Sequence, residues 1–434
     1  MGSVLHSRLF DVYLKQIDTA VASLYQERIK SIATRIELWR NTWTNAYNGL
    51  FAVRQADLLQ YGTLLGRLAE TYSLHLVAEE ILNRLAESAV SREPWIPDPA
   101  SVLITAGEFN RRRGDLDQAE SRYNEAVKIL DHDHVATESR QRAHREMGRV
   151  FYELAYLHQL RGDAGATRSA LERSEAESDL AKDELGAEIA RTLLAAVLYE
   201  EGFAGAAVLR LTESLSRLER LVDDPGVKEA GRSGLARRWV INAQINLGQA
   251  YLAVGNPEAA RRLIGRPADG EHGPSITGLA TAKRIEAQFC LAEGHLSSAL
   301  AAIGASWKAI EQQGDLTSTE LAAGTVALAG IIHALEGSEE SRKSALSCFE
   351  QACNLPTGLH NRRAQGWAWA GRAILAKKAG DGVAFLDAVH NGLALVQRCG
   401  APIRAFLLDL LRNSYSTEGG PDLNDLRELV CRSG

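Results

Sequence analysis

The densest group of side chains that could do chemistry in this sequence is the run Asp131-His132-Asp133-His134. Carboxylate oxygens and imidazole nitrogens are ligands for divalent metals, so a metal site is one interpretation of the run. A solvated loop is the other, because four adjacent residues between two helices do not easily converge on one ion. We expect the loop, and we expect neither a metal nor another cofactor.

Motifs for catalysis are missing from the sequence. It has no glycine-rich loop ending in Gly-Lys-Ser or Gly-Lys-Thr, no His-Glu-x-x-His and no Cys-x-x-Cys. A Gly-x-Ser-x-Gly elbow is missing too. One polar cluster, Tyr152, Glu153, Tyr156 and His158, leaves an enzyme on a helical scaffold as an alternative, although only the two tyrosines share a helix face. We predict a protein that is not an enzyme.

Composition restricts the partners and the location of the protein. The 434 residues include 49 basic and 55 acidic ones, for a net charge of −6. A protein that grips phosphates usually has a basic domain or stripe, so we expect no nucleic-acid partner. The longest apolar stretch, Leu321 to Leu335, is interrupted by Gly, Thr and His and is too short to cross a bilayer. No signal peptide and no disulfide framework can be recognised, which favours a cytoplasmic protein without membrane contact. The excess of arginine over lysine suggests a bacterial origin.

The elements that must position any site are helices, because Ala, Leu, Arg and Glu dominate and only 6% of the residues are aromatic. Two segments, Leu103 to Ile129 and Leu247 to Ile264, share one spacing. In each, a small residue is followed by a glycine, then by an alanine, then by a large residue, at steps of seven, five and four. These residues are Gly107, Gly114, Ala119 and Tyr123 in the first segment, and Gly248, Gly255, Ala260 and Ile264 in the second.

Each position in this pattern has a physical role. A glycine such as Gly107 lets a second helix cross closely, and Gly114 suits the left-handed residue that ends a helix. An alanine such as Ala119 is the contact point on the second helix. Weaker copies of the pattern predict further turns at Ser73, Gly162, Gly202, Gly294, Gly337 and Gly380.

The two strong segments resemble the tetratricopeptide repeat, with a period of about 44 residues instead of roughly 34. An array with this longer period resembles the extended tetratricopeptide arrays of kinesin light chains and of bacterial sensor-regulators. The resemblance implies an all-α fold, a right-handed α-solenoid of helical hairpins. About eight hairpins would occupy residues 59–412. Helices in residues 1–58 would cap one end of the array, and a short helix in the tail, residues 413–434, would cap the other end. Length suggests two or three domains, but a solenoid can be one continuous domain. A helical hairpin array of another class is the alternative.

In the tetratricopeptide family, certain first-helix positions line a concave groove. The resemblance assigns to this groove Glu108, Arg111, Arg149, Tyr152, Tyr156, Asn242, Asn246, Gln249, Arg284 and Gln288. Amide, guanidinium and phenol groups suit the binding of an extended peptide backbone. An ordinary solvated polar face is the other interpretation.

We therefore predict a module that binds a protein or peptide segment in this groove. The alternative is a sensor or inhibitory subunit that controls a separate bacterial effector, such as a protease, an ATPase or a transcription factor. The sequence leaves the oligomeric state open.

Overall fold

The computed structural model describes residues 75–91, 98–132, 137–264, 276–313, 316–355, 359–396, 401–413 and 420–433. Every secondary-structure element in these ranges is a helix, as predicted. Contacts divide the chain into unit 1, Met1–Glu146, and unit 2, Met147–Gly434. The N-terminal helices predicted within 1–58, and the hairpin turn predicted at Ser73, lie outside the described residues.

Unit 1 contains α4 (His75–Val90), α5 (Pro99–Arg113), α6 (Leu116–His132) and the first part of α7 (Thr137–Leu160). α5 packs against α4 and α6. The predicted crossing point is confirmed here, since a side chain at Gly107 would lie 2.5 Å from the ring of Tyr123. Asp131 and His132, which we expected in a loop, are the last residues of α6.

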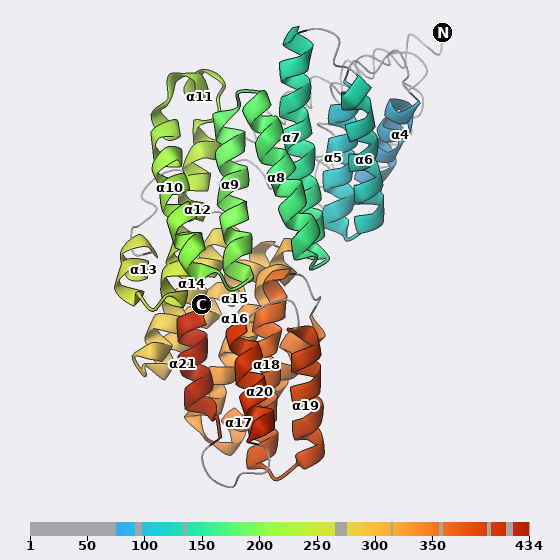
Figure 1. Cartoon of the computed structure of the whole chain (residues 1–434). Coiled ribbons are helices and arrows are strands. Elements are labelled where there is room, and N and C mark those ends of the chain that lie inside the picture. The colour runs from blue at the N-terminus through green and yellow to red at the C-terminus, as the bar shows by residue number, and fades with distance from the viewer. Residues whose placement is uncertain are drawn as a thin grey trace, which may run out of the picture. The chain divides into compact units, whose positions relative to one another are not determined.

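Unit 2 continues with fourteen described helices (Figure 1). They are α8 (Ala164–Leu180), α9 (Glu184–Glu200), α10 (Ala204–Asp223), α11 (Pro225–Glu229), α12 (Ser233–Ala253), α13 (Pro257–Ile264), α14 (Ile276–Ala292), α15 (Leu296–Gln313), α16 (Leu316–Glu336), α17 (Glu339–Asn354), α18 (Leu359–Lys378), α19 (Gly382–Leu395), α20 (Ala401–Arg412) and α21 (Leu423–Ser433).

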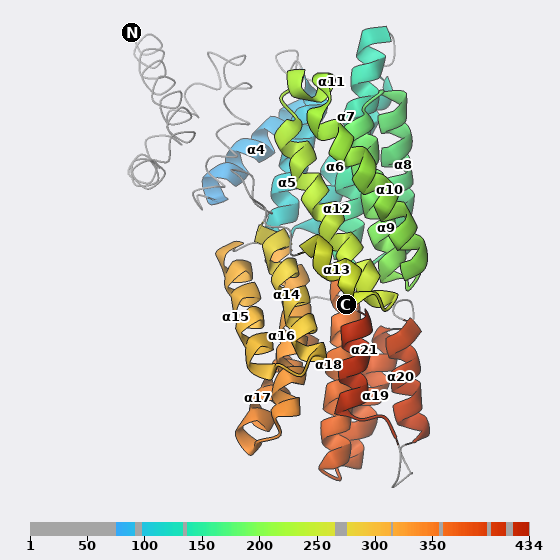
Figure 2. The same cartoon turned by 90° about the vertical axis from the view of Figure 1, so that its left-hand side faces the viewer.

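Neighbouring helices of unit 2 pair as hairpins, namely α9–α10, α12–α13, α14–α15, α16–α17 and α18–α19. The first helix of each hairpin also contacts the first helix of the next, as α12 contacts α14 and α16 contacts α18. Figure 2 shows α8–α13 in the upper part of unit 2, with α14–α17 and α18–α21 side by side beneath them. This is the packing of an α-helical repeat, in which each hairpin buries its apolar side on its neighbours.

Glycine ends the first helix of each hairpin at the predicted places. Gly114, Gly162, Gly202, Gly255, Gly294, Gly337 and Gly380 all have a left-handed backbone, with φ between 72° and 93°. At Gly380, for example, the glycine amide bonds the Lys377 carbonyl at 3.1 Å, and the next amide bonds the Ala376 carbonyl at 3.0 Å. Asp381 then accepts a hydrogen bond from the amide of Ala384, which starts α19. One glycine and one capping residue thus make the tight reversal between α18 and α19.

Lys182, between α8 and α9, also has a left-handed backbone, with φ 54°. A side chain in this conformation costs about 1–2 kcal/mol, which glycine does not incur. We expect Lys182→Gly to raise the free energy of unfolding by about 1 kcal/mol in urea denaturation. As a control, Ala181→Gly, at a right-handed position with φ −74°, should lower it. A loss of stability in Lys182→Gly would contradict this explanation.

None of the described helices combines the length and the apolar character needed to span a membrane.

Candidate functional site

The C-terminal helix α21 lies against α12, α14, α16 and α18, the first helices of four successive hairpins. We call the sides of these four helices that contact α21 the first-helix face. α21 buries Leu423, Leu426 and Val430. The Gln288 side-chain amide donates a hydrogen bond of 3.1 Å to the Val430 carbonyl, and the Cys431 thiol lies 3.5 Å from the Gln288 carbonyl oxygen. A helix is therefore seated on the surface where the sequence predicts a bound segment. The sequence predicts that this helix caps the end of the array, and that role stays a prediction.

The start of α21 is held by two reciprocal hydrogen bonds. The Asp422 carboxylate accepts from the amide of Asp425 at 3.1 Å, and the Asp425 carboxylate accepts from the amide of Asp422 at 2.8 Å. Asp422 also accepts from the amide of Asn424. Burial opposes the charge of Asp422, but these amides and nearby Lys378 outweigh it and hold its pKa below the ordinary value. The carboxylate is therefore ionised at neutral pH and caps the helix.

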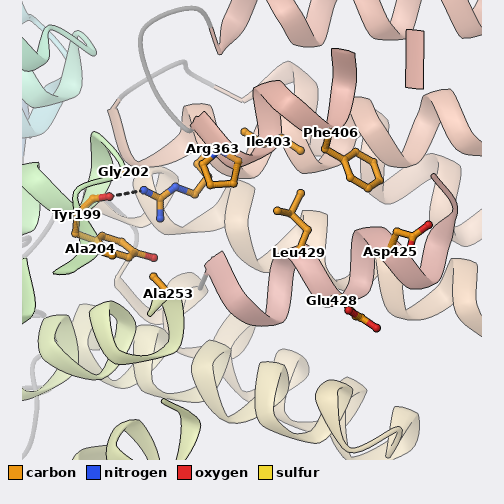
Figure 3. A pocket seen from close by; sticks show the side chains of 11 residues that line it. Tyr199, Gly202, Ala204, Ala253, Arg363, Ile403, Phe406, Asp425, Glu428 and Leu429 are labelled. Carbon is orange, nitrogen blue, oxygen red and sulfur yellow. Dashed lines mark hydrogen bonds between the residues drawn. The ribbon is translucent and has the colours of Figure 1, made fainter. Parts of the chain in front are cut away.

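Arg363 of α18 connects two parts of unit 2 that are 164 residues apart in sequence. Its guanidinium donates a 2.7 Å hydrogen bond to the Tyr199 carbonyl, lies 4.3 Å from the centre of the Tyr199 ring, and is 3.5 Å from the Glu200 carboxylate (Figure 3). The Arg363 and Glu200 side chains are only 9% and 12% exposed. Burial raises the pKa of the Tyr199 phenol, so the ring stays neutral. This contact joins α9 to α18.

Arg284 of α14 belongs to the same charged neighbourhood. It interacts electrostatically with Tyr199 and Glu200, and burial lowers its pKa below the ordinary value for arginine. Its guanidinium occupies the space that a side chain at position 324 of α16 would fill, so Gly324 is what admits it. Arg284 is thus packed within unit 2 and is not a free cation on a groove wall.

A partly open cavity of about 400 Å³ lies beside α21, between it, α20 and the turn that joins α9 to α10 (Figure 3). Leu429, Asp425 and Glu428 of α21 lie on one side of it, and Phe406 and Ile403 of α20 on another. The remaining lining residues are Tyr199, Gly202, Ala204, Ala253, Arg363 and Pro402. Its walls are mostly apolar, and Arg363 places a cation at one end.

The predicted groove residues are distributed over both units. Glu108, half-buried, and Arg111, buried, belong to α5 of unit 1. The others are on α7, α12 and α14 of unit 2: Arg149, Tyr152, Tyr156, Asn242, Asn246, Gln249, Arg284 and Gln288.

Several of these side chains already interact with the chain itself. Tyr152 packs edge-on against Trp239 at 6.4 Å, and Arg149 and Tyr156 have interactions too. Among the described residues, the half-buried amides of Asn242 and Asn246 have no hydrogen-bond partner. The structure therefore brings Gln288 into contact with α21 and Arg284 close to Tyr199 and Glu200, and it leaves the two asparagines of α12 available.

The sequence reasoning missed Tyr199, Glu200, Arg363 and the docking of α21. The apolar spacing of Leu423, Leu426 and Val430 was a signal that α21 has one buried side, but not of where that side packs. Nothing local signals the contact of Arg363 with α9.

No metal centre can be built from the part of the chain that is described, because no three His, Cys, Asp or Glu side chains converge there. Asp133 and His134 lie outside that part.

The cysteines described, Cys290, Cys348, Cys353 and Cys431, are all free thiols. Burial raises the pKa of Cys431 to about 12, so its thiol is protonated and reacts slowly while α21 is docked.

The chain matches no protein-family model, and no curated protein matches it. The tetratricopeptide assignment therefore stays a prediction from the spacing of glycine, alanine and large residues.

Proposed function

We propose that this chain is a non-enzymatic binding module, a right-handed superhelix of tetratricopeptide-like hairpins that holds a segment of a partner protein on its first-helix face. The observation that supports this proposal is the seating of α21 on α12, α14, α16 and α18. A surface that accepts one helix from its own chain has the shape and the apolar contacts to accept a segment of another protein.

The polar side chains of these first helices also suit a polypeptide. On the first-helix face, the Gln288 amide already donates to a backbone carbonyl, that of Val430. Asn242 and Asn246 lie earlier along α12 than Ala253, which borders the cavity beside α21, and their amides can each donate and accept. An amide hydrogen bond to a partner contributes about 0.5–1.5 kcal/mol, so two of them matter to affinity without dominating it.

We expect the double substitution Asn242→Ala and Asn246→Ala to weaken partner binding roughly tenfold, which corresponds to about 1.4 kcal/mol. Partners would be identified by affinity purification and mass spectrometry, and the dissociation constant would then be measured with the purified partner. Leu209→Ala is the control, because Leu209 lies on the second helix α10 and is 75% exposed. Equal affinity of the double variant and the control would remove the asparagines from the site.

A second candidate function is supported by the same helix. α21 covers the first-helix face, so the face can exist in a covered and an uncovered form. A subunit that controls a bacterial protease, ATPase or transcription factor needs two such forms. A variant with α21 released, such as Val430→Asp, should change the activity of such an effector more than the unaltered chain does. An effector that responds identically to both proteins would argue against this candidate.

A further inference from the structure

We infer that the segment bound by the first-helix face is an amphipathic helix with an acidic first turn, and that α21 is a resident helix which this partner displaces. The inference rests on the proposed function and names the class of its partner. Three features carry it: the spacing of the apolar residues in α21, the charge around its first turn, and the cavity beside it.

The apolar spacing defines what the face recognises. Leu423, Leu426 and Val430 are buried, at positions i, i+3 and i+7, while Asn424 and Glu428 are exposed. Recognition of a helix in a groove by apolar residues at this spacing is a recurrent mode of protein binding. A partner helix with the same spacing would make the same buried contacts.

The charge around the first turn defines the polarity of the bound helix. Asp422 lies near Lys378, in the last turn of α18, while Leu429 lines the cavity together with Arg363 near the start of α18. α21 therefore runs antiparallel to α18, with its acidic N-terminal end beside a basic helix end. Negative charge is favourable at a helix N-terminus and positive charge at a C-terminus, so both helices gain from this pairing.

The cavity beside α21 leaves room for a side chain larger than that of Leu429. Leu429 is half-buried and borders the cavity of about 400 Å³, whose opposite wall is formed by Phe406 and Ile403. Apolar side chains that border unfilled space lose contacts that a larger side chain would make. A partner helix with an aromatic residue at the position of Leu429 would fill the cavity, pack on Phe406 and bind more tightly than α21.

The test uses the full chain and a fluorescein-labelled peptide with the sequence of residues 421–433. Val430→Asp places a charge at a buried position and should release α21, which would be verified by faster alkylation of Cys431. We expect the peptide to bind this variant at least tenfold more tightly than the unaltered chain, by fluorescence anisotropy. Val383→Asp is the matched control, because Val383 is 74% exposed on α19, and it should behave like the unaltered chain.

A second peptide tests the cavity. The peptide with Leu429→Trp should bind the Val430→Asp chain roughly tenfold more tightly than the unaltered peptide. If Val430→Asp does not fold, Leu429→Trp in the full chain replaces it, and slower alkylation of Cys431 is expected because α21 is held more firmly. Faster alkylation in that variant would overturn the inference.

Two further results would overturn the inference. One is a folded chain with a reactive Cys431 that does not bind the peptide. The other is a chain that dimerises by exchanging α21, measured by light scattering, because the occupant would then be a second copy. These outcomes are separate from failure of the proposed function, which is judged with the asparagine variants and a purified partner.

Discussion

Replacing Arg363 with leucine is expected to lower the free energy of unfolding of unit 2 by about 3 kcal/mol, because it removes a close countercharge of the buried Glu200 carboxylate, which then depends on its interaction with Arg284. Arg363 also loses its hydrogen bond to the Tyr199 carbonyl and its contact with the Tyr199 ring. The measurement is urea denaturation followed by circular dichroism, with Arg412→Leu as the control. Arg412 pairs with Asp409 on α20 but its side chain is 75% exposed, so its loss should cost less than about 1 kcal/mol.

A double variant separates charge from packing. Adding Glu200→Leu to Arg363→Leu removes the carboxylate that lost this countercharge, and replacement of a buried ion pair by apolar residues is often close to neutral. We expect the double variant to recover part of the lost stability, because the buried Arg284 then loses its interaction with Glu200. If Arg363→Leu costs no more than Arg412→Leu, the contact between α9 and α18 does not stabilise unit 2.

Phe349→Ala should destabilise unit 2 by about 3–5 kcal/mol, the usual cost of removing a buried aromatic ring. Phe349 of α17 is fully buried, and its ring fills the space that side chains at Gly330 of α16 and Gly371 of α18 would need. One ring therefore fixes the distance between three helices, and the glycines cannot move inward far enough to close the hole that alanine leaves.

The control for this prediction is Leu346→Ala on the same helix, where the side chain is 41% exposed. We expect Leu346→Ala to lower the free energy of unfolding by less than about 1 kcal/mol, because water can fill the space that the partly exposed side chain leaves. The comparison uses the denaturation midpoints and slopes of the two variants. Similar losses of stability in the two variants would mean that the Phe349 ring does not hold α17 in place.

The sequence predicts the hairpins well because their determinants are local. A left-handed turn needs glycine, and a close helix crossing needs a small residue, so Gly255, Gly294 and Gly380 mark their turns without knowledge of the rest of the chain. The turn at Lys182 escaped prediction because lysine occupies the position that glycine usually takes. Its amide bonds the Asp179 carbonyl and the next amide bonds the Ser178 carbonyl, the pattern of the glycine turns, but the lysine itself gives no signal of it.

The candidate site was predicted only in part, because its geometry depends on distant contacts. First-helix positions identified Gln288 and Arg284 as residues of interest, but not that Gln288 binds Val430. Repeat spacing gives the direction in which a side chain points within one hairpin. It does not show that a helix from the end of the chain returns to cover that side chain, nor that Arg363 reaches Tyr199.

The contact of Arg363 with Tyr199 has a consequence for how such a chain can evolve. Open repeat arrays gain or lose repeats easily, since each repeat touches only its neighbours. In unit 2, however, α18 must arrive at α9, and α21 must reach α12, α14 and α16. Inserting or deleting one hairpin between α9 and α18 would move α18 away from α9 and α21 away from α12, α14 and α16. The number of repeats in this unit is therefore fixed by closure, as the number of blades is fixed in a propeller.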